Sequence, residues 1–332
     1  MGKQSRMKKE RHEQREAERA RLDAQVEKRR DECEALFDAF ERVLADQGIK
    51  IPRDSKLEQA LLLARHIKYI REEDAALPEL TPADEDDMFR RTTWLWGMAP
   101  KVIDAARHED FRELVPHLKL VVEGEFAQSV PGDPNEDSDK LFELVVALAV
   151  LPFAKNLKVD TGNAAAKNPD LLFDFAGTRW GIACKALYTV KPERYRESVI
   201  KGASQIEKSE AERGVVCVSL RNLLDQSLFL PRRGDALVGM SKQAMREVLA
   251  QEEARIKRAI VDPVREDIGR DFETRPKTEK AVIHVSAGCA RTGTPEDIRM
   301  TYFAHLMTVG TVYDAFEEAL NSGLQAAQPP LP

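Results

Sequence analysis

The side chains best suited to chemistry lie at the ends of apolar runs between residues 139 and 220. Glu143 interrupts a strongly apolar segment that is typical of a buried helix, and Asp170 comes directly before a short apolar run. In the next apolar run, Ala183 and Lys185 are two residues apart. On a strand such residues face the same side, roughly 6–7 Å apart. If the two apolar runs form neighbouring strands, the Asp170 carboxylate and the Lys185 amine are expected to meet at one end of a sheet.

Such a group of side chains fits phosphodiester hydrolysis. The reaction needs an activated water and neutralisation of developing charge, and a hard divalent cation held by carboxylates supplies both. We expect Asp170 to bind the ion directly, Glu143 to bind it through water, and the backbone carbonyl of Cys184 to add a further oxygen ligand. Lys185 would orient the water and offset phosphoryl charge.

The elements that must position these residues form an α/β core. Turn residues at Ala176-Gly177-Thr178 separate two apolar runs and predict a hairpin. The expected order is helix, three strands, helix and strand, with the sheet covered by helices. The expected ranges are a helix at 139–151, strands at 158–160, 171–175 and 180–186, a helix at 193–213 and a strand at 215–220.

This order resembles the PD-(D/E)xK, or restriction-endonuclease-like, nuclease superfamily. The resemblance rests on Pro169-Asp170, on Lys185 and on Gln205 in the following helix, and it covers about a quarter of the chain. It implies a mixed sheet flanked by helices, cleavage of double-stranded DNA, Mg²⁺ or Mn²⁺ as cofactor, and catalytic roles for Asp170, Lys185, Gln205 and Glu143. The family commonly has an acid two residues before the lysine, where this chain has Ala183.

Alanine cannot bind a metal, so we expect weakened ion binding and activity far below that of a chain with an acid at position 183. The intact Asp170 and Lys185 favour a deliberately inactivated variant, and a natural pseudo-nuclease that only binds is the alternative. Fewer carboxylates also repel a phosphate backbone less, so DNA binding would persist.

A relocated acid is a third explanation for the alanine. Asp174 lies on the same strand face as Asp170 but roughly 13 Å along the strand, which is too far. Glu193 and Glu197 on the next helix are better placed.

Basic side chains near the motif are candidate nucleic-acid contacts. Arg194, Lys201 and Lys208 fall close to one helical face together with Gln205, and Arg232-Arg233 form a separate basic turn. Phosphate contacts of this kind position a duplex without reading its sequence. Ordinary solvated charges remain an equally good interpretation.

The first 130 residues predict an all-helical N-terminal domain, with a long charged helix at 5–47, and a linker at 131–137 separates it from a nuclease-like domain at 138–324. Thr81-Pro82 begins one of its helices, and we expect Trp94 and Trp96 to be core residues. These helices can also join two copies of the chain or a partner subunit. The second domain is expected to contain a helix at 241–268, a strand at 281–287, a helix from Thr294 to about Leu320 and a disordered tail at 325–332.

Composition sets the remaining limits. The 332 residues carry a net charge of −6, so any DNA-binding surface must be local. The four cysteines are far apart and predict neither a zinc site nor a redox motif. No membrane span or signal peptide is evident, which predicts a cytoplasmic protein. We therefore expect a metal-dependent DNA endonuclease, by analogy one acting in restriction or antiphage defence. The rivals are a non-catalytic nucleic-acid-binding or regulatory subunit and an interaction protein built on the long helices.

Overall fold

The computed structural model describes residues 31–32, 34–70, 81–124, 136–160, 168–234, 236–294 and 297–325. Most of the expected charged helix, residues 131–135 of the expected linker and the tail after residue 325 lie outside these ranges. Glu136, at the end of the expected linker, already begins helix α5.

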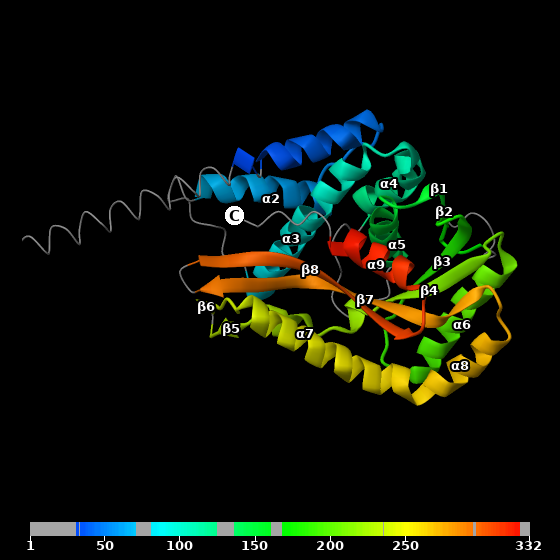
Figure 1. Cartoon of the computed structure of the whole chain (residues 1–332). Helices are drawn as coiled ribbons and strands as arrows, with labels where there is room; N and C mark the ends of the chain where they lie inside the picture. The colour runs from blue at the N-terminus through cyan, green and yellow to red at the C-terminus, as the bar shows by residue number, and fades with distance from the viewer. Residues whose placement is uncertain are drawn as a thin grey trace, which may run out of the picture.

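The described residues form a mixed α/β fold around a six-stranded sheet with the order β1-β2-β3-β4-β7-β8 (Figure 1). Strands β3, β4 and β7 are parallel to one another, whereas β1, β2 and β8 each run antiparallel to their neighbours. The strands are β1 (Lys155–Val159), β2 (Leu171–Phe175), β3 (Thr178–Ala186), β4 (Arg213–Ser219), β7 (Thr278–Thr294) and β8 (Asp297–Gly310).

The hairpin between β2 and β3 confirms the turn expected from the sequence. Phe175 pairs with Thr178, which leaves a two-residue connection. Ala176 and Gly177 both have positive φ, at 51° and 80°, the combination that suits a tight hairpin turn. Glycine adopts this backbone conformation without strain. The turn sets the register that places the residue before β2 beside the carboxyl end of β3.

Helix α6 (Pro192–Lys208) connects the parallel strands β3 and β4, as such a connection requires. It covers one face of the sheet together with α7 (Lys242–Ile256) and α8 (Arg265–Glu273). Helices α5 (Glu136–Val150) and α9 (Asp314–Gln325) lie over the other face (Figure 1). Successive residues of β3 face opposite sides of the sheet: Ile182 packs on the side covered by α5, and Ala183 packs on the side covered by α6.

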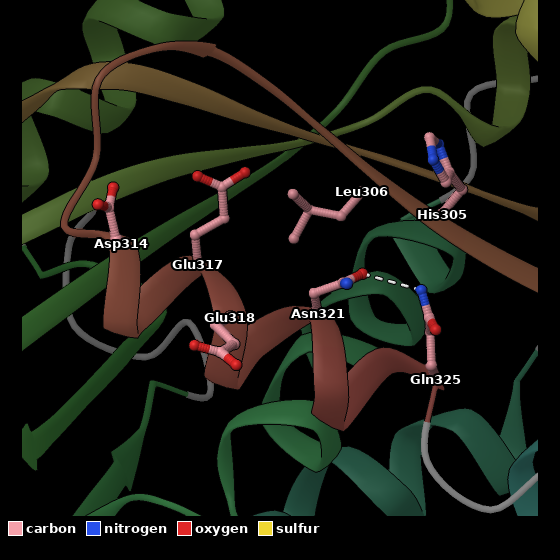
Figure 2. A pocket seen from close by; sticks show the side chains of 7 residues that line it. All are labelled: His305, Leu306, Asp314, Glu317, Glu318, Asn321 and Gln325. Atoms are coloured by element: carbon pink, nitrogen blue, oxygen red, sulfur yellow. Dashed lines mark hydrogen bonds between the residues drawn. The ribbon is translucent and has the colours of Figure 1, made fainter.

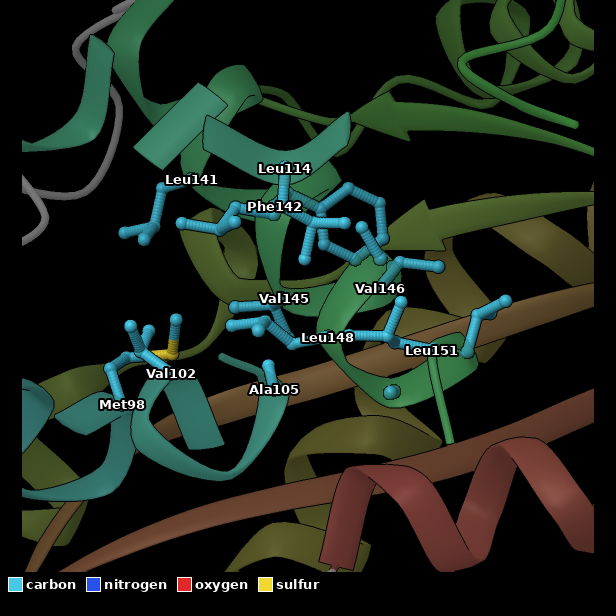
Figure 3. Close-up of a cluster of buried hydrophobic side chains, with 14 of the residues drawn as sticks. Met98, Val102, Ala105, Leu114, Leu141, Phe142, Val145, Val146, Leu148 and Leu151 are labelled. Atoms are coloured by element: carbon cyan, nitrogen blue, oxygen red, sulfur yellow. The ribbon is translucent and has the colours of Figure 1, made fainter. Parts of the chain in front are cut away.

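The helices before residue 125 pack into the same hydrophobic cluster as the sheet. Figure 3 shows Met98 and Val102 of α3 facing Val145 and Leu148 of α5. The division into two domains stays a prediction, but the described helices on both sides of it share a core. These elements are a helix over 34–46, α2 (Lys56–Ile70), α3 (Pro82–Ala105), a 3₁₀ turn (Glu109–Leu114) and α4 (Val115–Glu123).

Two local expectations for α3 are confirmed. The Thr81 hydroxyl accepts a hydrogen bond from the Asp84 amide and caps the helix, with proline at its first position. Trp94 and Trp96 are buried core residues. Their aromatic area therefore stabilises the packing of α3 instead of facing a solvent-exposed ligand.

The helix expected from Thr294 to Leu320 is wrong. Residues 297–310 form β8, which pairs along its whole length with β7, and α9 begins only at Asp314. β-branched and aromatic residues such as Thr301, Tyr302 and Phe303 favour a strand. The expected strand at 281–287 is correspondingly the centre of the much longer β7.

The single helix expected at 241–268 is interrupted. After α7 a π-helical segment (Lys257–Val261) and a 3₁₀ turn (Asp262–Val264) precede α8. Pro263 has no amide hydrogen to donate to the preceding turn, which explains the change of helix type.

The buried His284 on β7 should make the protein acid-sensitive. Its ring bonds the Tyr195 hydroxyl at 2.9 Å, and burial lowers its pKa to about 4, with smaller effects of Glu253 and Lys257. Because the unfolded chain binds a proton near pH 6.5 and the folded chain does not, the free energy of unfolding should fall as pH decreases from about 6.5 to 4, by about 3 kcal/mol at most. Urea unfolding at pH 7 and pH 5 measures this. The variant His284→Gln should lose less stability over the same interval, and equal losses would contradict the assignment.

Candidate functional site

Asp170 and Lys185 meet at one end of the sheet, and Glu143 lies near enough to interact electrostatically with Asp170. Asp170 directly precedes β2, and Lys185 lies near the carboxyl end of β3, which pairs with β2. Glu143 lies in α5, which contacts β3. The carboxyl ends of parallel strands are where α/β proteins commonly bind ligands.

Asp170 is held through one carboxylate oxygen. Oδ2 accepts a 2.6 Å hydrogen bond from the Cys184 amide and lies 3.5 Å from the Lys185 amine. The Lys185 amine also donates to the Cys184 carbonyl at 2.7 Å. Lysine therefore already engages the carbonyl that was expected to bind metal, while no described hydrogen bond involves Oδ1 of Asp170.

Glu143 is held in the same way. Its Oε2 lies 2.6 Å from Nε2 of His117 and 2.8 Å from the Lys140 amine. No described hydrogen bond uses Oε1. Both carboxylates thus have one oxygen fixed by the protein and a second oxygen not engaged by a described side chain.

Further charged side chains complete this group, and sequence reasoning missed them. Asp139 accepts a 2.6 Å hydrogen bond from the Tyr188 hydroxyl and lies one helical turn before Glu143. The backbone amide of Asp160 donates to the backbone carbonyl of Asp170 at 2.9 Å. Asp160 is therefore a fourth acidic residue near the site. Only the spacing of Asp139, Lys140 and Glu143 on one helix could have indicated part of this set.

The environments of the acids push their pKa values apart. Burial raises the pKa of Asp170, which the Lys185 charge only partly offsets, and burial likewise raises the pKa of Asp139. Burial also acts on Glu143, but hydrogen bonds from His117 and Lys140 outweigh it and lower its pKa. Neighbouring carboxyl groups with opposed shifts are typical of sites that handle protons.

Asp170 and Glu143 offer carboxylate oxygens, the type of donor that a hard cation such as Mg²⁺ prefers. Mg²⁺ usually keeps several waters and needs one or two carboxylates plus substrate phosphates. Asp170 and Glu143 would supply the carboxylates. Within the described ranges, no three His, Cys, Asp or Glu side chains are close enough to hold a metal by themselves. The cysteines Cys184, Cys217 and Cys289 are buried and form no disulfide with one another.

Ala183 is fully buried and packs beneath α6. A Cβ atom placed on Gly202 would lie 3.2 Å from the Ala183 Cβ and 3.0 Å from a Val216 methyl group. The small residues at 183 and 202 therefore allow α6 to approach the sheet closely. The space between Ala183 and Gly202 is too tight for a larger side chain to enter without movement of its neighbours.

Gln205 lies in the buried part of α6, with its amide oxygen unpartnered among the described residues. No hydrogen bond in that part of the chain joins it to Asp170. Arg194, Lys201 and Lys208 are exposed on α6, and Arg194 pairs with Glu197 at 2.9 Å. This helix covers the opposite face of the sheet from α5 (Figure 1).

The other acids considered as replacements do not join the site. Asp174 bonds Asn156 and Arg179, at the far end of β2 from Asp170, as the strand spacing predicts. Glu197 and Glu193 are exposed on α6, and no described ion pair or hydrogen bond links either of them to Asp170 or Lys185.

The Arg232-Arg233 turn is separate from this site. Arg232 in β5 (Arg232–Arg233) pairs with Asp86 at 2.8 Å, and the buried Arg291 pairs with the same carboxylate. Figure 1 shows β5 and β6 (Ala236–Leu237) beside the β7–β8 hairpin, at the opposite end of the molecule from β2. Arg232 thus tethers its turn to α3.

An open groove lies between β8 and α9 (Figure 2). Glu317 and Glu318 line it from α9, and His305 lines it from β8. The His305 ring bonds Glu253 at 2.8 Å, and this bond raises its pKa. The groove contains none of the residues that sequence reasoning selected.

No described helix is both long and apolar enough to cross a membrane. Comparisons of the chain with protein families, curated proteins and solved structures found no match.

Proposed function

We propose that this chain is built as a Mg²⁺- or Mn²⁺-dependent nuclease that acts on double-stranded DNA and is impaired by alanine at position 183. One observation carries the proposal. Asp170, Glu143 and Lys185, which were selected from sequence alone, come together at one sheet edge. The order α5-β1-β2-β3-α6-β4 supports the proposal, because it is the order of helix, three strands, helix and strand expected from the sequence.

Each residue has a role in this proposal. The bound cation would activate water and neutralise phosphoryl charge. Asp170 and Glu143 would hold it through the oxygens that no described side chain engages. The Lys185 amine, which contacts Asp170 and the Cys184 carbonyl, is placed to orient the attacking water. Gln205 and the exposed cations Arg194, Lys201 and Lys208 of α6 are proposed to assist with DNA.

The close contact of Ala183 with Gly202 favours a native alanine over an engineered replacement. A chain evolved around glutamate would need room for four more side-chain heavy atoms at this buried position. In a native site without this acid, cleavage would be slow and dependent on substrate phosphates for metal binding. A role in restriction or antiphage defence is part of the proposal only as an analogy.

The second candidate is a non-catalytic DNA-binding or regulatory subunit. It is favoured by the lysines, because Lys185 and Lys140 already neutralise Asp170 and Glu143 without a metal. A site with its charges compensated in this way can persist as a structural ion-pair network. This candidate predicts salt-sensitive DNA binding without cleavage.

A cleavage assay tests the proposal. The full chain, Asp170→Asn and Lys185→Ala should be incubated with supercoiled plasmid and Mn²⁺ at high enzyme concentration. Slow nicking by the parent chain is expected, with loss of at least about tenfold in each variant, since each removes charge stabilisation. Glu210→Gln, an exposed acid paired with Lys158, is the matched control. Nicking that persists unchanged in both variants would indicate a contaminating nuclease and reject the proposal.

A further inference from the structure

We infer that His117, supplied by the N-terminal helices, is a positioning residue that aims the Glu143 carboxylate in the candidate site. The inference rests on the proposed function and adds a residue from outside the segment that resembles a nuclease. It also gives the N-terminal helices a direct part in the site, in addition to the joining of chain copies or a partner subunit expected for them.

The contact is buried and short. His117 lies on α4 with no solvent exposure, and its Nε2 is 2.6 Å from Oε2 of Glu143. Its other nitrogen, Nδ1, is buried and has no hydrogen-bond partner among the described residues. Leu114 and Leu118, close to it in sequence, belong to the buried core that α4 shares with α5.

This environment selects the tautomer. A hydrogen on Nδ1 would leave a buried N–H group unpaired, which costs more than an unpaired acceptor. The hydrogen therefore resides on Nε2, which donates to Glu143. His117 thus donates to Oε2 of Glu143 through Nε2, and the Lys140 amine lies 2.8 Å from the same oxygen.

The donor fixes which oxygen faces the ligand. His117 and Lys140 both engage Oε2, so Oε1 is the atom left for a cation or a bound water. A freely rotating carboxylate would lose conformational entropy on binding, whereas a locked one does not. Metal-binding groups are typically oriented by such outer hydrogen bonds, whose loss weakens metal affinity about 10–100-fold.

Mn²⁺ affinity of the full chain, measured by electron paramagnetic resonance titration, tests this role independently of cleavage. We expect Glu143→Gln and His117→Phe each to lose affinity, the latter about tenfold. His117→Gln should stay within about threefold of the parent chain, because its amide nitrogen can reach Glu143 in place of Nε2. His117→Asn is one methylene shorter, cannot reach, and should behave like His117→Phe. The Gln and Asn pair decides the test if the phenylalanine variant does not fold.

His284→Gln is the matched control, since it changes another buried histidine that hydrogen-bonds Tyr195 instead of a carboxylate. Its Mn²⁺ affinity should equal that of the parent chain. Folded His117→Asn and His117→Gln proteins with equal affinity would overturn the positioning role while the Glu143→Gln result upholds the metal site. A parent chain without saturable Mn²⁺ binding would overturn the metal-dependent function itself, and the inference with it.

Discussion

Replacing Ala183 with glutamate is expected to increase Mn²⁺-dependent DNA cleavage by on the order of 10²-fold, the scale of one electrostatic group in a catalytic site. The new carboxylate would lie on the same strand face as Lys185, two residues away. Asp170 immediately precedes β2, so extending the β2–β3 register by one residue places it opposite position 183. Plasmid nicking rates, compared with the parent chain, measure the gain.

The same substitution must overcome the contact with Gly202. The added side-chain atoms enter a fully buried position, so we expect a loss in the free energy of unfolding of about 1–3 kcal/mol. Ala183→Gln is the matched control, because it has the same shape without the charge. It should lose similar stability and gain no cleavage.

Equal nicking rates for the glutamate and glutamine variants, both folded, would reject position 183 as the site of a missing acid. The double variant Ala183→Glu, Asp170→Asn should return to the low rate. If it keeps the gained activity, the new acid acts without Asp170 and the proposed pair of carboxylates is wrong.

Replacing Trp180 with alanine is expected to cost about 3–5 kcal/mol in the free energy of unfolding, the range for large buried aromatics. Trp180 lies on β3 with 1% exposure and stacks on Phe316 of α9, with ring centroids 4.4 Å apart. Tyr313 and the Arg213 guanidinium also contact its ring. The indole therefore joins α9 to the strand that carries Lys185.

Urea unfolding followed by circular dichroism measures this loss. Trp180→Phe keeps an aromatic ring in the stack and should lose less than half as much stability. Leu62→Ala, which truncates an exposed side chain of α2, should change the midpoint little. A Trp180→Ala protein as stable as the parent chain would show that α9 is not held to the sheet through this stack.

Local patterns predicted the part of the fold nearest the candidate site. The strand at 171–175, the turn at Ala176-Gly177 and the helix after β3 agree with the structure, because each depends on residues close in sequence. β8 was wrongly expected to be helical. Its strand character depends on continuous pairing with β7. The Thr294-Pro295 pair was interpreted as a helix start, and a local motif of this kind carries no information about that pairing.

The sequence by itself was enough to select Glu143, Asp170 and Lys185 as candidates, and the two-residue turn between β2 and β3 is the local feature that brings Asp170 beside Lys185. Only the tertiary structure decided what surrounds them. His117 hydrogen-bonds Glu143 from another helix, the Tyr188 hydroxyl hydrogen-bonds Asp139, and Arg232 forms an ion pair with Asp86. These contacts join residues 26, 49 and 146 positions apart, and side chains at such separations meet only through packing of the whole core.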